Sequence, residues 1–297
     1  MFSIITPTYN RYNTLYRVYD SLKQQTFKNF HWIIIDDAST DKTEDLIRTW
    51  INENNFFEIT YYKLKKNKGK PFALNYGFKY CKEPITIIAD SDDSFYSNTL
   101  EDLHILWREI DKTIEGNRIA SVWTLTQNEE GQIEGDLFPK NLWQVNLNER
   151  ILDRTKRIKG EKWHSWRTQI LAEHKMFYNE NAAYVSEGAT WNSINKKYDF
   201  LCTNKVHRTY WFSAEGLIQQ KKSKIKRAKI RYYSSYYQLY TANTLEIYSK
   251  KYYRNLAFEF IKAYLIYRDQ KCSLSSSKLF ISFLSFLRIS MNRLFKI

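Results

Sequence analysis

The sequence predicts an α/β fold, with a mostly parallel sheet flanked by helices and a helical extension at the C-terminus. Short β-branched or apolar runs alternate with helical patterns over residues 1–125. This alternation is typical of successive βαβ units, which place parallel strands in one sheet. The 297 residues are 43% hydrophobic and include only 8 Gly and 4 Pro, so the chain is expected to form a substantial core with few flexible linkers.

Each expected element has its own signal in the sequence. The β-branched runs predict strands at residues 2–6, 32–35, 58–62, 85–89 and 119–124. Apolar residues at helical spacing predict helices around Leu15–Leu22 and Leu46–Ile51. Further along, residues 188–198 look helical, residues 199–202 look like a short strand, and residues 236–268 look like a long helical region.

Polar segments follow four of these strands. They are PTYNR at Pro7–Arg11, DDASTDKT at Asp36–Thr43, NKGK at Asn67–Lys70 and ADSDD at Ala89–Asp93. The carboxyl ends of parallel strands meet at one edge of a sheet, so we expect these segments to form one cleft. Asp41 with Glu44 three residues later also fits a helix capping box, which is the purely structural interpretation of part of this pattern.

The segment ITIIADSDDS at residues 85–94 is the most informative one. A strand leads directly into Asp90, Asp92 and Asp93. Carboxylates this close repel one another unless a hard cation such as Mg²⁺ or Mn²⁺ neutralises them. A solvated acidic turn after a strand is the alternative interpretation.

Charge is divided unevenly along the chain. Residues 1–150 hold 18 Lys and Arg against 22 Asp and Glu, whereas residues 151–297 hold 28 against 10. An acidic partner is therefore expected to engage the second half. The three cysteines lie far apart without a CxxC pair, which argues against a disulfide framework and indicates a reducing, cytosolic environment. The apolar run at residues 2–6 is too short for a signal peptide.

In this order, the segments FSIITPTYNR, IIIDDASTDKTEDLI, NKGKPFALNYGF, ITIIADSDD and YVSEGATWNSINKKYDFLCTNKVHRTY resemble family 2 glycosyltransferases of the bacterial surface-polysaccharide type. The resemblance covers most of residues 1–216. It implies the GT-A fold, a Rossmann-like sheet, and inverting transfer of a sugar from a nucleotide-sugar, with a UDP-sugar favoured. The transferred group would be a hexosyl or N-acetylhexosaminyl unit.

The resemblance also implies roles for particular residues. Nucleotide-sugar binding is expected of Pro7, Thr8, Tyr9, Arg11, Asp36, Asp37, Asn67, Gly69, Lys70, Asn75, Asp90 and Ser91. Asp37 would contact the uracil edge, and Lys70 would meet phosphate. The DXD-type acids Asp92 and Asp90, supported by Asp93, would hold Mn²⁺ or Mg²⁺, which stabilises the departing diphosphate when it is bound.

The catalytic base implied by the resemblance is Glu187, in the segment Ser186-Glu187-Gly188. An inverting transfer needs a carboxylate within hydrogen-bond reach of the acceptor hydroxyl. Many relatives carry a second acid where this chain has Gly188, so a paired-carboxylate mechanism is not expected. A Glu near the N-terminus of the following helix is the structural alternative.

The C-terminal region combines charge with aromatic residues. The segment KKSKIKRAKIR at Lys221–Arg231 holds seven cations in eleven residues. The tail LFISFLSFL at Leu279–Leu287 is apolar and is followed by Arg288, Arg293, Phe295 and Lys296. This pattern resembles an interfacial amphipathic anchor on an anionic membrane, and a helix packed on the protein itself is the alternative.

Together these features predict a catalytic domain at residues 1–220 and a basic, aromatic-rich helical region at residues 221–297. The predicted enzyme is a metal-dependent glycosyltransferase that acts in surface glycan biosynthesis on a saccharide or lipid-linked acceptor. It would be cytoplasmic and peripheral on the inner face of the cell membrane. A nucleotidyltransferase that makes a sugar nucleotide is one alternative, and a basic nucleic-acid-binding protein is another, although nucleic acid is not the partner we expect.

Overall fold

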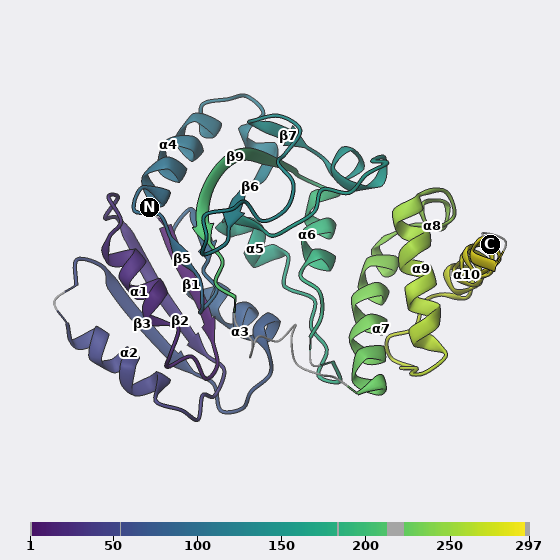
Figure 1. The fold of residues 1–297 in the computed structure, drawn as a ribbon, viewed down its shortest axis with the longest axis horizontal. Helices are drawn as coiled ribbons and strands as arrows, with labels where there is room; N and C mark the ends of the chain where they lie inside the picture. The colour runs from purple at the N-terminus through teal and green to yellow at the C-terminus, as the bar shows by residue number, and fades with distance from the viewer. Residues whose placement is uncertain (1, 54, 183, 213–222, 295–297) are drawn as a thin grey trace. The chain divides into compact units, whose positions relative to one another are not determined.

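The computed structural model describes residues 2–53, 55–182, 184–212 and 223–294 (Figure 1). Its strands are β1 Phe2–Thr8, β2 Phe30–Asp36, β3 Glu58–Lys63, β4 Ile85–Ile88, β5 Ser94–Phe95, β6 Ile119–Gln127, β7 Trp143–Val145, β8 Lys162–Arg167 and β9 Asp199–Thr209. Its α-helices are α1 Tyr16–Lys23, α2 Thr43–Asn52, α3 Lys70–Gly77, α4 Thr99–Asp111, α5 Thr168–Glu173, α6 Gly188–Asn195, α7 Lys224–Thr241, α8 Thr244–Ser249, α9 Lys251–Tyr264 and α10 Ser276–Leu294. Lys221, Lys222, Phe295 and Lys296 of the predicted C-terminal anchor lie outside the described residues.

The chain forms two compact units that interleave along the sequence. Unit 1 comprises residues 1–145, 158–175 and 198–216, and unit 2 comprises residues 146–157, 176–197 and 217–297. The division into these two units does not test the predicted boundary between a catalytic domain and a C-terminal region at residue 220. That boundary stays a prediction.

Unit 1 is built on a mixed sheet with the strand order β3-β2-β1-β4-β8-β6-β9-β5, and β7 pairs with β9. Strands β3, β2, β1 and β4 are parallel to one another, while β8 runs antiparallel to both β4 and β6. The expected α/β class is confirmed. Parallel pairing covers the first four strands and the β6–β9 pair, and the remaining pairings are antiparallel.

The buried strands follow from their composition. All seven residues of β1 are buried, and β2 is buried except for His31. Strands covered on both faces are rich in apolar residues, and the buried hydroxyls of Ser3 and Thr6 accept hydrogen bonds from the Lys82 N–H and from Trp32 Nε1. Their register sets the site, since Thr8 at the end of β1 lies opposite Asp36 at the end of β2.

The helix α3 was not expected from the sequence. It begins after Gly69, whose φ of 89° lies in the left-handed region that glycine adopts without strain. Pro71 occupies the first turn, where its missing N–H costs nothing. The turn therefore delivers Lys70 to the first position of a helix.

Unit 2 has its own hydrophobic core, and the helices expected at its C-terminus are present. Tyr232, Tyr233, Tyr253 and Phe260 are almost completely buried within it. The helical region expected over residues 236–268 is divided into α7, α8 and α9. The division occurs at Asn243, which forms a capping box with Glu246 and so starts a new helix.

The helix α10 has one apolar face in contact with unit 2 and another that is exposed. Leu279, Ile281, Phe283 and Phe286 pack against the core of the unit. Phe280, Leu284, Leu287, Met291 and Leu294 are all more than 40% exposed. In the described part of the chain, no helix has both the length and the apolar character of a membrane span.

Candidate functional site

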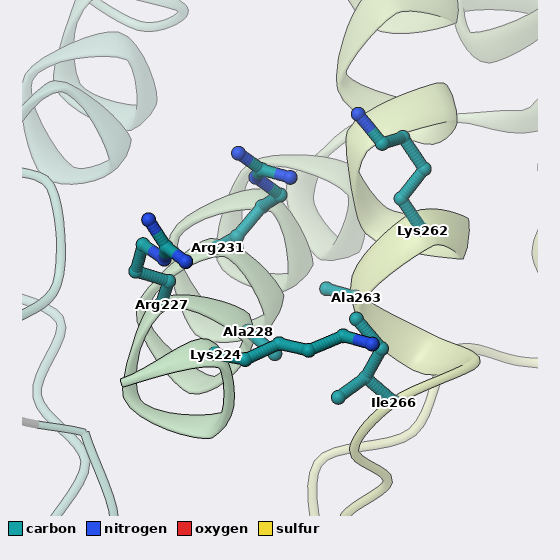
Figure 2. A pocket seen from close by; sticks show the side chains of 7 residues that line it. All are labelled: Lys224, Arg227, Ala228, Arg231, Lys262, Ala263 and Ile266. Atoms are coloured by element: carbon teal, nitrogen blue, oxygen red, sulfur yellow. The ribbon is translucent and has the colours of Figure 1, made fainter. Parts of the chain in front are cut away.

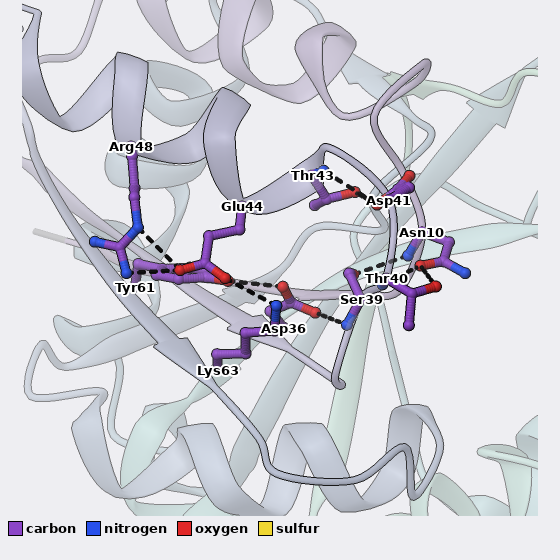
Figure 3. Close-up of polar contacts among 10 residues, drawn as sticks. All are labelled: Asn10, Asp36, Ser39, Thr40, Asp41, Thr43, Glu44, Arg48, Tyr61 and Lys63. Carbon is purple, nitrogen blue, oxygen red and sulfur yellow. Dashed lines mark hydrogen bonds and ion pairs between the residues drawn. The ribbon is translucent and has the colours of Figure 1, made fainter.

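The loop after β1 is tied to the loop after β2. The Asn10 N–H donates to Ser39 Oγ at 2.9 Å, and Asn10 Oδ1 accepts from the Thr40 N–H at 2.8 Å (Figure 3). Asn10 has a φ of 52°, which Asn tolerates better than most residues. The ring of Tyr9 is 42% exposed, so it is available to a ligand.

Asp36 is fully buried and serves the protein's own structure. Its Oδ1 accepts from the Ser39 N–H at 2.7 Å and its Oδ2 accepts from the Tyr61 hydroxyl at 2.7 Å (Figure 3). This arrangement shapes the loop after β2. The anticipated capping box does not form in α2, because Asp41 accepts from Thr43 instead and Glu44 pairs with Arg48 and Lys63.

Asp37 joins the second and third strand ends. Its two carboxylate oxygens accept from the backbone N–H groups of Lys68 and Gly69, at 2.9 and 2.6 Å. Burial raises the pKa of Asp37, although these two hydrogen bonds lower it. The NKGK turn is thus held against β2 through a carboxylate, with Asn67 exposed beside it.

The acids after β4 are surrounded by cations. Lys70 Nζ lies 2.5 Å from Asp90 Oδ1, and Arg11 lies 3.6 Å from Asp92 Oδ2. Asp90 and Asp92 remain 32% and 24% exposed at their side chains. Residues from the ends of β1 and β4 and the start of α3 are therefore brought together, as the sequence predicts.

Asp93 differs from the other two acids because it is buried. Its Oδ2 accepts from Arg208 at 2.9 Å, and Arg208 also lies 3.7 Å from Asp90. Among the residues that the structure describes, none forms a hydrogen bond with Asp93 Oδ1. This geometry fits a supporting role for Asp93 better than direct contact with a ligand.

The electrostatics separate the three acids. Burial would raise the pKa of Asp90, but Lys70 and Arg208 outweigh it and hold the pKa below the usual range. Burial and the charge of Asp90 raise the pKa of Asp92. Burial also raises the pKa of Asp93, against the effect of Arg208. Of the three acids, Asp92 has the most distant ion-pair partner, with Arg11 at 3.6 Å, against 2.5 Å from Asp90 to Lys70 and 2.9 Å from Asp93 to Arg208.

Sequence reasoning missed Arg208 and His164. Arg208 is 4% exposed on β9, donates to Thr126 Oγ1 at 3.1 Å and lies 3.5 Å from Glu161. His164 on β8 is also buried, and its Nδ1 accepts from Trp166 Nε1 at 2.6 Å. The segment NKVHRTY gave no clear signal for Arg208, because it also holds Lys205, whose side chain is exposed, so the residue types do not show which cation is buried.

The remaining predicted site residues take varied positions. Pro7 and Thr8 are buried in β1, and Thr8 Oγ1 has no hydrogen-bond partner in the described part of the chain. Ser91 is buried, and its carbonyl accepts from Thr14 Oγ1. Asn75 is half-buried on α3.

Glu187 belongs to unit 2, whereas the other predicted site residues belong to unit 1. It lies at the N-cap of α6, which is the position that the structural alternative gives it, so that alternative stays open beside the catalytic one. A Cβ added to Gly188 would lie 3.5 Å from Ser186 Oγ, an ordinary contact. Glycine is therefore not required sterically where many relatives carry a second acid.

The fit of a metal rests on Asp92. Within the described residues, no group of three or more His, Cys, Asp or Glu side chains is arranged to hold an ion. The partly exposed Asp92 carboxylate still suits a hard divalent cation whose other ligands come from a diphosphate and water. Lys70, Arg11 and Arg208 would share the charge of such a ligand.

Comparisons with known structures show the same fold. The structure of Staphylococcus aureus TarS 1-349 in complex with UDP-GlcNAc covers 97% of this chain and 80% of that one, with a TM-score of 0.62 and 17% identity. The mannosyltransferase PcManGT from Pyrobaculum calidifontis, in complex with GDP-Man and Mn²⁺, covers 98% of this chain and 75% of that one, with a TM-score of 0.52 and 15% identity. The GT-A fold is thereby confirmed.

Sequence comparisons point to the same group. An uncharacterized glycosyltransferase of Rickettsia bellii is 32% identical over 150 residues, which are 46% of this chain and 20% of that protein. The Staphylococcus aureus poly(ribitol-phosphate) beta-N-acetylglucosaminyltransferase TarS is 32% identical over 104 residues, 34% of this chain and 18% of that protein. The similarity thus spans about a fifth of each of these relatives. The family model described as "Glycosyl transferase family 2" matches residues 3–183, and the chain belongs to this family of glycosyltransferases.

Proposed function

We propose that the protein is a metal-dependent, inverting glycosyltransferase that uses a UDP-sugar and acts in surface glycan biosynthesis. The observation that carries this proposal is the arrangement after β4, where the partly exposed Asp90 and Asp92 lie beside Lys70 and Arg11. A diphosphate needs cations around its oxygens, and a divalent ion needs carboxylate oxygens. This cluster brings both together from the loop after β1, the start of α3 and the turn after β4.

The donor assignment draws on the relatives. TarS is solved with UDP-GlcNAc and PcManGT with GDP-Man and Mn²⁺, so nucleotide-sugars and Mn²⁺ bind proteins of this fold. A hexosyl or N-acetylhexosaminyl group would be transferred to a saccharide or lipid-linked acceptor. Tyr9 and Asp37 would contact the nucleoside, and Lys70 would meet the phosphates.

The roles within the reaction follow from charge. A bound Mn²⁺ or Mg²⁺ supplies electrophilic stabilisation of the departing diphosphate. Asp92 would ligate the ion, Asp90 would position Lys70, and Asp93 would hold Arg208 next to both. Glu187 would take the proton of the acceptor hydroxyl, as the family resemblance implies.

A peripheral membrane location at the cytoplasmic face is part of the proposal. The exposed apolar residues of α10 recur at positions 280, 284, 287, 291 and 294, which is the spacing of one helical face. Arg288 and Arg293 lie on the same helix, and α7 adds further cations. An apolar face with nearby cations suits the surface of an anionic bilayer.

One screen tests the activity. UDP-, GDP- and dTDP-sugars are added with and without Mn²⁺, and thermal stabilisation is measured. We expect a UDP-sugar to stabilise the protein only when Mn²⁺ is present, and an acceptor to cause release of UDP. Release of pyrophosphate would indicate a nucleotidyltransferase, and salt-sensitive binding of RNA or DNA without nucleotide-sugar binding would indicate the nucleic-acid alternative.

A further inference from the structure

Unit 2 contains a small cavity lined almost entirely by cations and small residues. Its volume is about 230 Å³, and its walls come from α7 and α9 (Figure 2). The lining residues are Lys224, Arg227, Ala228, Arg231, Lys262, Ala263 and Ile266. Four of these seven residues carry a positive charge.

The contribution of α7 to this cavity is one face of the helix. Lys224, Arg227, Ala228 and Arg231 are spaced i, i+3, i+4 and i+7, so their side chains emerge on the same side. Ala228 and Ala263 are buried and form the floor, because their small side chains leave room between the helices. Lys224, Arg227 and Arg231 are exposed, so their charges border an open recess over the two buried alanines.

The positive charge of the cavity is only partly compensated. Glu259 Oε2 lies 2.9 Å from Arg231, and Glu259 Oε1 lies 3.6 Å from Lys262. For Lys224 and Arg227, the structure shows no ion pair within the described residues. One carboxylate thus pairs with two of the four cations, which leaves a net charge of about three positive units at the recess.

The position of these cations near the N-terminus of α7 adds to the excess of positive charge at the cavity. Lys224 begins the helix and the first turn contains no acidic residue. The N-terminus of a helix already carries a partial positive charge, so cations there are disfavoured unless an anion neutralises them. Two arginines in one cavity also present paired N–H groups that match the oxygens of a phosphate.

We propose that this cavity binds a phosphate group. Its volume lies below the roughly 300–1,000 Å³ typical of sites that enclose a whole small molecule, so a phosphate group fits better than a complete nucleotide. A phosphate carries up to two negative charges and meets several cations at once, which a single carboxylate cannot do. The group could belong to a lipid headgroup or to a free phosphate.

The inference does not depend on the sugar-transfer reaction, and the test is a binding experiment on the full chain. Inorganic phosphate is titrated against the protein with UDP present, so that a nucleotide site is occupied. The variant Lys224→Gln/Arg227→Gln removes two lining cations. The control Lys226→Gln/Lys229→Gln removes the same charge from residues of α7 that do not line the cavity.

We expect phosphate to bind at least about tenfold more weakly to the cavity variant and within about twofold of wild type to the control. A Glu259→Gln variant, which frees Arg231 and Lys262, should bind phosphate more tightly. This gain cannot come from misfolding. Equal losses in the cavity and control variants, or no saturable binding to wild type, would overturn the proposal.

Vesicles distinguish the two sources of the phosphate. Phosphatidylglycerol vesicles are compared with phosphatidylcholine vesicles for the same variants. Selective loss of phosphatidylglycerol binding in the cavity variant would identify a lipid headgroup. Loss of phosphate binding alone, with vesicle binding unchanged from the control, would identify a free phosphate. The nucleotide-sugar screen is a separate experiment. A negative result for phosphate binding in unit 2 therefore leaves the proposed glycosyltransferase function open, and the reverse also holds.

Discussion

Arg208 Nη1 donates to Asp93 Oδ2 at 2.9 Å, linking β9 to the acidic turn after β4 across 115 residues of sequence. Both side chains are almost completely buried. Arg208 also faces Asp90, so one guanidinium holds two of the three acids of this turn in place. The geometry of the candidate donor site therefore depends on a residue that belongs to none of its loops.

Loss of this guanidinium should destabilise the fold. We expect Arg208→Met to lower the free energy of unfolding by about 3–5 kcal/mol, because it leaves Asp93 buried without its charged partner. Chemical denaturation measures the change. The double variant Arg208→Met/Asp93→Asn should recover part of the loss, and a single-variant cost below about 1 kcal/mol would contradict the role of the pair.

Removal of the Asp92 carboxylate should affect ligand binding and leave the fold intact. We expect Asp92→Ala to lose the Mn²⁺-dependent part of the thermal stabilisation by a UDP-sugar, since binding to the native state is what raises the melting temperature. Asp20→Ala, at an exposed position of α1, is the matched control. Unchanged metal-dependent stabilisation would remove Asp92 from the site.

Replacing Glu187, the proposed base, should lower turnover and leave donor binding unchanged. We expect Glu187→Gln to keep the donor affinity and to lower kcat by about 10²–10⁴-fold, because a carboxamide cannot accept the acceptor proton. Steady-state kinetics with a UDP-release assay measures both. Gly188→Ala, which the space beside Ser186 accommodates, should stay near wild-type turnover. Near-normal kcat in the Gln variant would require another base.

His164 should make stability depend on pH. Burial and the charges of Arg208 and Lys70 lower its pKa to about 3 from 6.5. Between these two values the unfolded chain binds a proton that the folded chain refuses, so stability falls as the pH is lowered from about 6.5 towards 3. The slope is up to about 1.4 kcal/mol per pH unit.

The variant His164→Gln isolates this effect. Asp93 has a raised pKa and acts in the opposite direction, but it is present in both proteins. The stability of wild type relative to the Gln variant should therefore decrease between pH 7 and pH 4.5, as measured by urea unfolding. A difference that stays constant over this range would show that His164 is not the titrating group.

The exposed face of α10 should determine vesicle binding. We expect Phe280→Ser/Leu287→Ser to weaken binding to phosphatidylglycerol vesicles by at least about tenfold, because each side chain would otherwise bury apolar surface in the bilayer interface. Cosedimentation measures this binding. Leu245→Ser is the control, because it replaces an exposed leucine on α8 with the same polar residue. Equal binding by all three proteins would exclude α10 as the anchor.

Local sequence patterns were sufficient for most of the secondary structure of unit 1. The β-branched runs predicted β1 to β4 and β6, and helical spacing predicted α1 and α2, because each signal depends on neighbours within one element. The helices α3, α4 and α5 and the strands β5, β7 and β8 were not predicted. The helix α3 begins in a glycine turn, and β8 contains two tryptophans, a histidine and two terminal cations in six residues, which is not a clear alternation.

The sequence by itself determined the α/β class, the parallel strands and the acids at the end of β4, since these follow from periodicity and from residue types in succession. Only the tertiary structure decided that β8 lies between β4 and β6, that residues 176–197 pack with the C-terminal helices, and that Arg208 reaches Asp93. These are contacts between distant segments. Their free energy comes from burying and pairing groups that no local pattern brings together.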